Sequence, residues 1–263
     1  MGLDRLTKLY SEYQIASKEC LEQEKSPYML IKELCGHTEY FQSTEQLKER
    51  LPNKSEQRGA DFPFWGEKYF SKNEKGLRTM IIAQDSLSED AGSIVFYAPL
   101  LHLNWDKATY NTQFYKRLPK KTFGYTSYQD VLFALNSWQV DLNFLYMTDA
   151  RKVYNSNNLP KEQQKIDKVA SYDFIKKEIE IVQPHLIYLL GSQAFTLFGY
   201  KGERFAEYVG KKIIEIENIP AIVAPFITGN GNKGSNKERF VERFKGTQAL
   251  SLQLREELLK AKI

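Results

Sequence analysis

Three polar segments follow apolar runs in this 263-residue chain, and each carries side chains able to do chemistry. "TMIIA" leads into Gln84 and Asp85, "LNFLYM" into "TDARK" (148–152), and "AIVAPF" into "TGNGNKGS" (228–235). If the apolar runs are parallel strands, these segments meet at the carboxyl edge of one sheet, where α/β proteins bind ligands. A carboxylate at that edge can orient a water molecule or stabilise a developing positive charge. Asp85 is therefore the first catalytic candidate, and its alternative role is to cap the next segment.

The elements that must position these segments are four short apolar runs with helical spacing between them. The runs are nearly continuous rather than alternating, which favours a parallel sheet covered on both faces. They are residues 78–83, 142–147, 185–190 and 221–226. The apolar stripe that ends at Val182 predicts one helix, Gly191 and Ser192 predict the start of another, and residues 236–260 predict a long amphipathic helix. The expected fold is α/β, a three-layer α/β/α sandwich with a central, mostly parallel four-stranded sheet.

The N-terminal part of the chain differs from the rest. It is strongly polar, with helical spacing of Leu3, Leu6, Tyr10 and Tyr13. We therefore expect a helical extension over residues 1–60 and an α/β domain over residues 61–263. Proline and glycine punctuate residues 51–66, which predicts a linker or a long loop.

Composition excludes several classes of protein. The chain is 42% hydrophobic and 27% charged, and no apolar run reaches the roughly 18 residues that a membrane span needs. The charged N-terminus has no apolar core of a signal peptide, so we expect a cytoplasmic protein, and a monomer. Cys20 and Cys35 are too few for a disulfide framework, and His37, His102 and His185 are scattered. Neither a metal nor a cofactor is implied.

The net charge of +4 is unevenly distributed. Residues 107–121 contain no acid, but they include Lys107, Lys116, Arg117, Lys120 and Lys121, with Tyr110, Phe114 and Tyr115 between them. Basic side chains can neutralise phosphates, and aromatic rings can stack on bases. The stretch therefore predicts either a nucleic-acid contact, with Lys116 and Arg117 as candidates, or a solvated basic loop.

Taken together and in this order, the motifs resemble those of the uracil-DNA glycosylase superfamily. "AQDS" (83–86) is similar to the motif that follows the first strand of that family. "AGSIVFYAP" supplies a glycine (Gly92) and the aromatic Phe96, with Pro99 three residues on. "LYMTDARK" places Tyr146, Thr148 and Lys152 as the family does, and "LIYLLGSQAF" is similar to its third strand and helix start. The resemblance covers roughly residues 60–245.

The resemblance implies an enzyme that flips a nucleotide out of the DNA stack and hydrolyses its N-glycosidic bond, leaving an abasic site. It assigns water activation to Asp85 and stacking on the base to Phe96. Gln84 would direct its backbone N–H to a base carbonyl. Thr228 stands where the family usually has the histidine that contacts the leaving base, so Thr228 would supply a hydrogen bond without the imidazole.

Asp149 stands where the family has the asparagine that reads the edge of uracil. An amide both donates and accepts, whereas an ionised carboxylate only accepts, and cytosine offers an amino donor. Asp149 therefore favours cytosine-type bases over uracil. Because excision of ordinary cytosine would be toxic, we expect a modified cytosine, hydroxymethylated or glucosylated, in phage DNA. The alternative is that Asp149 caps the following turn or pairs with Arg151.

The glycine-rich segment "GNGNKG" (229–234) fits G-x-G-x-x-G, but only a terminal helix follows it, so a dinucleotide site is not favoured. Its amides, together with Asn230, Asn232 and Lys233, are candidates to bind the DNA backbone. A plain flexible loop is the alternative.

Two other activities stay open from the sequence alone. One is a DNA-binding member of the same fold without catalysis, and the other is a nucleotide-binding transferase that uses the glycine-rich loop. Phe64 and Trp65 in "FPFWG" (62–66) would line the pocket or wedge into DNA, although a packing role is the favoured interpretation.

Overall fold

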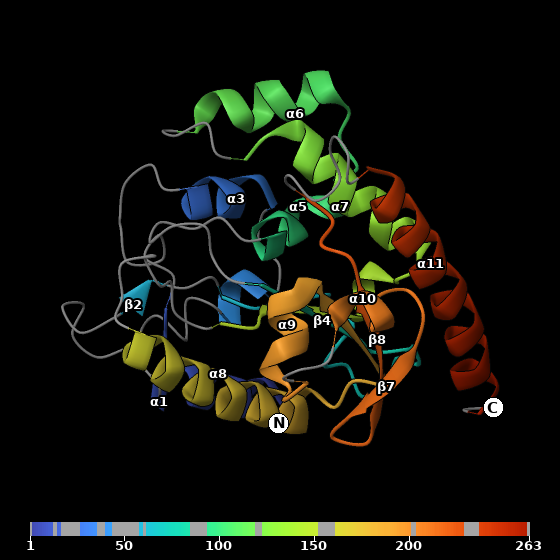
Figure 1. Ribbon diagram of the computed structural model, residues 1–263. Coiled ribbons are helices and arrows are strands. Elements are labelled where there is room, and N and C mark those ends of the chain that lie inside the picture. The colour runs from blue at the N-terminus through green and yellow to red at the C-terminus, as the bar shows by residue number, and fades with distance from the viewer. Residues whose placement is uncertain are drawn as a thin grey trace.

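A mixed six-stranded sheet forms the centre of the molecule in the computed structural model (Figure 1). The structure describes residues 2–12, 15–16, 27–35, 40–43, 58–59, 62–84, 94–118, 123–151, 161–200, 204–228 and 237–261. The sheet has the strand order β3-β5-β4-β6-β8-β7. Its strands are β3 (Phe64–Trp65), β4 (Thr79–Ala83), β5 (Leu145–Asp149), β6 (Leu186–Leu190), β7 (Ile213–Ile216) and β8 (Ile219–Ala224).

The four expected strands are the four central ones, and they are parallel to one another. The prediction of a four-stranded sheet is wrong, because β3 and β7 add an antiparallel strand at each edge. β3 has only two residues and lies in the segment expected to be a loop. β7 alternates exposed and buried residues, as an edge strand covered on one face does.

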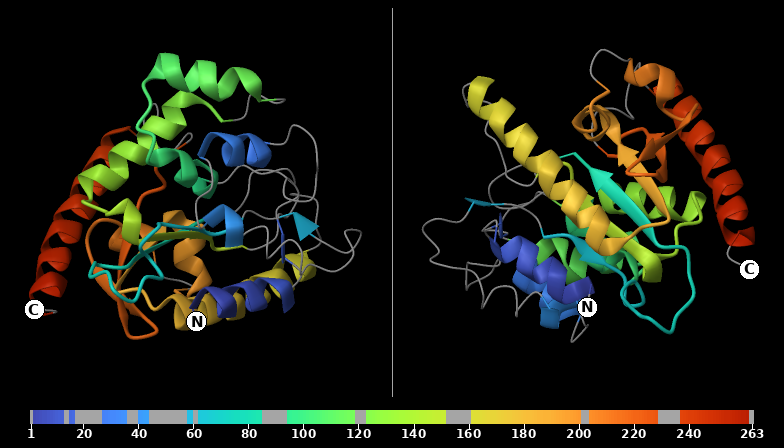
Figure 2. Two further views of the ribbon diagram at one scale, coloured as in Figure 1. Left: turned by 180° about the vertical axis from the view of Figure 1, so that it is seen from behind. Right: turned by 90° about the horizontal axis from the view of Figure 1, so that it is seen from below.

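Helices lie on both faces of the sheet. Tyr146 pairs with Met80 and Tyr188 pairs with Ile81, so the two tyrosines point to opposite faces. On the Tyr146 face lie α8 (Lys161–Val182) and α9 (Gly191–Leu197), and α9 contacts β4, β6 and β8. On the Tyr188 face lie α7 (Tyr125–Ser137) and α11 (Lys237–Lys260). Figure 2 shows α11 and α8 on different sides of the strands.

The chain changes direction once within the sheet. β4 leads to β5 on one side through α7, and β5 then leads back across β4 to β6 through α8 on the other face. Right-handed crossovers require this change of face when the direction reverses. The reversal places the topological switch point at the carboxyl ends of β4 and β6, which is the ligand position in open α/β sheets.

The N-terminal segment shares the core of the sheet domain. α1 (Gly2–Glu12) lies alongside α8 (Figure 2), and Leu6, Leu9 and Tyr10 belong to the same hydrophobic cluster as the strands. α3 (Pro27–Cys35) contacts α5 (Ala98–Leu101). A separate pair of short strands joins β1 (Ile15–Ala16) to β2 (Arg58–Gly59).

The remaining elements are short. They are η2 (Ile94–Tyr97), α6 (Lys107–Gln113), η3 (Tyr115–Arg117), η4 (Leu142–Phe144) and α10 (Phe205–Tyr208). Because η4 takes the first residues of the expected second strand, β5 begins at Leu145 and ends at Asp149. None of the helices within the described ranges is long and apolar enough to cross a membrane.

Candidate functional site

The ends of β4 and β5 are held together beyond the last strand residues. The backbone N–H of Ala150 donates to the Ala83 carbonyl, and the N–H of Arg151 donates to the Gln84 carbonyl, both at 3.1 Å. The strand ends that carry Gln84 and Asp149, predicted from separate motifs, therefore lie side by side at the carboxyl edge, with the two side chains directed to opposite faces of the sheet. The first two of the three predicted segments meet there, as expected.

Gln84 also lies at the switch point between β4 and β6. Gly191, the first residue of α9, has a φ of +82°, and a Cβ added to it would lie 2.3 Å from the Gln84 side-chain nitrogen. The same Cβ would lie 3.3 Å from the Cβ of Phe226, which follows β8. A glycine is needed at position 191 for the backbone conformation and for the close approach of the amide. The ends of β4, β6 and β8 thus converge on Gln84.

Asp149 is buried, with 3% of its surface exposed. It pairs with Ala83 at the end of β5, and its neighbour Thr148 points to the α8 face. Successive strand residues point to opposite faces, so Asp149 is directed away from α8. A buried carboxylate at this edge is suited to accept hydrogen bonds from an amino group of a ligand.

Phe96 lies in η2 and is 7% exposed. Its ring stacks on Phe123 with a centroid distance of 4.4 Å and an interplanar angle of 26°. η2 contacts β5, so the Phe96 segment lies against the strand that ends in Asp149. One face of Phe96 is covered by Phe123, and a stacked base would need the other face. Thr228 follows β8 and is also buried, at 8% exposure.

Several predicted site residues lie outside the described residues. They are Asp85, Gly92, Lys152, Asn230, Asn232 and Lys233. Their predicted roles stay predictions.

Residues 107–118 of the basic stretch are not the loop that one interpretation expected, and residues 119–121 lie outside the described residues. Asp106 caps α6 by accepting a hydrogen bond from the Thr109 N–H at 2.7 Å, and η3 follows. Tyr110 and Phe114 are completely buried, so neither ring is available to stack on a base, and this part of the prediction is wrong. Arg117 donates to both oxygens of Glu33 at 2.8 Å, while Lys116 is exposed.

Sequence reasoning missed a buried carboxylate, Glu178 of α8. Its side chain is completely buried and accepts hydrogen bonds from the hydroxyls of Tyr10 and Tyr146 at 2.6 Å and of Thr148 at 3.3 Å. Burial, followed by the charge of Glu178, holds the pKa of Tyr10 well above its ordinary value. The network ties α1, α8 and β5 together directly beside Asp149. A signal was present, because Glu178 interrupts the apolar stripe between Ile175 and Val182.

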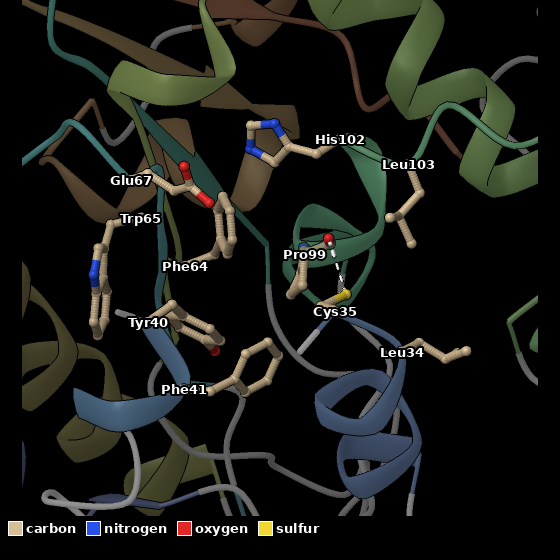
Figure 3. A pocket seen from close by; sticks show the side chains of 10 residues that line it. All are labelled: Leu34, Cys35, Tyr40, Phe41, Phe64, Trp65, Glu67, Pro99, His102 and Leu103. Atoms are coloured by element: carbon tan, nitrogen blue, oxygen red, sulfur yellow. Dashed lines mark hydrogen bonds between the residues drawn. The ribbon is translucent and has the colours of Figure 1, made fainter. Parts of the chain in front are cut away.

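A second hollow lies between α3, β3 and α5, with a volume of about 200 Å³. Figure 3 shows the rings of Tyr40, Phe41 and Phe64 facing Pro99 and Cys35 across it, with Glu67 and His102 at one end. The Cys35 thiol donates to the Pro99 carbonyl at 3.4 Å, and burial raises its pKa to about 12, which makes it a poor nucleophile. Burial also lowers the pKa of His102.

The aromatic pair of "FPFWG" belongs to this hollow. Phe64 and Trp65 are buried, and both rings meet Tyr40. The packing interpretation is confirmed. Nowhere in the described part of the chain do three histidine, cysteine, aspartate or glutamate side chains gather as a metal site would require.

Comparison with known proteins adds no assignment, because no protein-family model and no curated protein matches the chain.

Proposed function

We propose that the protein is a DNA glycosylase, a divergent member of the uracil-DNA glycosylase superfamily. The observation that carries the proposal is the junction of the strand ends that carry Gln84 and Asp149, next to the switch point between β4 and β6, held by the bond from the Arg151 backbone N–H to the Gln84 carbonyl. The two motifs are joined through their backbones at the position where open α/β sheets bind ligands, and this junction supports a base-binding site. Helices on both faces of the central strands suit the three-layer architecture that the resemblance implies.

The proposed reaction is hydrolysis of the bond between the sugar and an extruded base. Asp85 accepts a proton from the attacking water, which bonds to C1′ of the sugar as the bond to the base nitrogen breaks. The electron pair of that bond leaves with the base, and Thr228 donates a hydrogen bond to the departing base. Phe96 stacks on the base in the pocket, and Gln84 orients it.

The proposed substrate is a cytosine-type base, including modified cytosine. Asp149 in its ionised form accepts a hydrogen bond from the exocyclic amino group, a donor that uracil lacks. Replacing Asp149 with asparagine restores an edge that both donates and accepts, and the proposal predicts a shift of excision toward uracil. If Asp149→Asn has the same base preference as the wild type, Asp149 does not recognise the base.

The test is alkali-revealed strand cleavage on labelled oligonucleotides. The panel holds uracil, cytosine, thymine, 5-hydroxymethylcytosine and its glucosylated form, single- and double-stranded. The predicted result is cleavage at one base by the wild type and no cleavage by Asp85→Asn. Urea denaturation should show that the variant is as stable as the wild type. Absence of cleavage across the panel would contradict the proposal. If the protein then still binds DNA, a non-catalytic DNA-binding module is favoured. If it binds nucleotides but not DNA, a nucleotide-binding transferase is favoured.

A further inference from the structure

A second basic surface lies where two segments distant in the sequence come together. The turn around α10 contributes exposed Arg204, Lys211 and Lys212, and the first turns of α11 contribute exposed Arg239 and half-buried Arg243. We call these five residues the α10–α11 basic surface. Acids are mixed with the bases along both segments, so no run of charge marks this surface in the sequence.

The surface lies at the carboxyl edge of the sheet. The Gly210 N–H donates to the Val223 carbonyl at 2.9 Å, and β7 begins beside Ile222, near the carboxyl end of β8. Lys211 and Lys212 therefore flank the segment that leads to Thr228. A Cβ added to Gly246 would lie 2.1 Å from the Gly210 carbonyl oxygen, so α11 and the turn meet through their backbones and fix the two halves of the surface together.

The positive charges of this surface have no ion-pair partner among the described residues, and two of them lie beside aromatic rings. Among the residues that the structure describes, no carboxylate lies within ion-pair distance of any of the five, although Glu207, Glu238 and Glu242 are close in sequence. Aromatic rings support two of the cations instead. The Lys212 ammonium lies 4.5 Å from the centroid of Tyr208, and the Arg243 guanidinium lies 5.8 Å from that of Phe205. The side chains are supported, and their charge stays available to a partner.

We propose that the α10–α11 basic surface binds the phosphates of a DNA strand on the β8 side of the base site. The inference rests on the proposed function for the identity of the polyanion. Phosphates are the groups that unpaired lysine and arginine side chains contact in DNA complexes, and such contacts position the strand without reading its sequence. A surface contiguous with the carboxyl edge would hold the backbone that flanks an extruded nucleotide.

The test is the salt dependence of binding to a fluorescein-labelled, undamaged 20-base-pair duplex. K211Q/K212Q is compared with K72Q/K75Q, which removes the same charge from exposed lysines of the loop before β4, at the amino edge. Removing one lysine–phosphate contact lowers the slope of log Kd against log salt concentration by about 0.9. K211Q/K212Q is expected to lower the slope by about 2 and weaken binding about tenfold or more at 0.1 M salt, whereas K72Q/K75Q leaves both unchanged.

The outcomes separate this inference from the proposed function. Equal slopes for the two variants would overturn the surface assignment, even if base excision by the wild type is intact. If the slope is lowered in K211Q/K212Q but the wild type excises no base, the assignment of the surface to DNA phosphates stands and the proposed glycosylase activity is contradicted. If both variants bind the duplex like the wild type while K211Q/K212Q alone fails to bind phosphatidylserine vesicles, the surface is a membrane contact and the inference fails.

Discussion

The amino and carboxyl edges of the same parallel strands hold their polar groups in different ways. At the amino edge the groups bond to one another. The Arg255 guanidinium donates to the Thr79 hydroxyl at 3.0 Å. The Arg78 backbone N–H donates to the Nδ1 of His185 at 2.9 Å, and the His185 backbone N–H donates to the Arg78 carbonyl at 2.8 Å. These bonds join the starts of β4 and β6 to α11.

At the carboxyl edge, the polar side chains singled out by the sequence are placed differently. Gln84 lies over Gly191 at the point where the chain reverses direction, and Lys211 and Lys212 carry charge that no described carboxylate neutralises. The proposed function places binding at the carboxyl edge, and the bonds at the amino edge lead us to expect that it chiefly serves stability. Substitutions that affect one edge should therefore leave the function of the other intact.

Glu178 is the sharpest test of this division, because it is a stabilising carboxylate close to the carboxyl edge. Glu178→Ala removes the acceptor of three buried hydroxyls and leaves a cavity, and we expect a loss of about 3 to 5 kcal/mol in the free energy of unfolding. Urea denaturation measures the loss. Tyr10→Phe, which removes one of the three hydrogen bonds, should cost about 1 kcal/mol. A midpoint of Glu178→Ala equal to that of the wild type would contradict a structural role.

Arg255→Met tests the amino edge itself. The substitution keeps most of the apolar contact of the buried side chain and removes the bond to Thr79, so we expect a loss of about 2 to 3 kcal/mol in the free energy of unfolding. Base excision at a temperature where the variant is folded should stay within about twofold of the wild type. A selective loss of excision would show that the amino edge also contributes to the site.

Gly191→Ala tests the carboxyl edge, with Gly199→Ala as its matched control. Both glycines have positive φ, +82° and +89°, but a Cβ at Gly199 meets nothing within 4 Å. Each substitution should cost about 1 to 2 kcal/mol of stability through the backbone. Only Gly191→Ala displaces the Gln84 amide, so excision should fall about tenfold or more in that variant alone. Equal activity of the two variants would remove the Gln84 side chain from the site.

Raising the pH into the alkaline range should lower the free energy of unfolding through the buried tyrosines, two of which bond to Glu178. Burial chiefly raises the folded-state pKa of Tyr10, Tyr69 and Tyr146, so each contributes stability that is complete below about pH 10 and is lost as pH rises above it. Each tyrosine adds about 1.4 kcal/mol per pH unit to the slope in that range. Tyr10→Phe should reduce the slope of unfolding free energy between about pH 10 and 11.5 by about that amount. An unchanged slope would place Tyr10 in contact with water.

The central strands and the meeting of Gln84 with Asp149 could be predicted from the sequence. Strands buried on both faces are continuous apolar runs, and the carboxyl ends of parallel strands share one edge. The edge strands could not be predicted in the same way, because β3 is only two residues long and β7 is exposed on one face.

Two features of the structure depend on contacts between distant segments. Glu178 bonds to Tyr10 of α1, and α11 packs against the turn at Gly210. No pattern of neighbouring residues in the sequence predicts either contact. The charge run at 107–121 shows the opposite case. Its bases are dense in the sequence, yet Tyr110 and Phe114 are inside the molecule and Arg117 is paired with Glu33.

The most direct test of the central claim is detection of the released base by mass spectrometry. DNA containing glucosylated 5-hydroxymethylcytosine, and matched DNA containing cytosine or uracil, would be incubated with the wild type, Asp85→Asn and Arg255→Met. The account predicts a free cytosine-type base from the wild type and Arg255→Met, and none from Asp85→Asn. No free base from the wild type, or equal release by Asp85→Asn, would contradict a glycosylase whose site lies at the carboxyl edge.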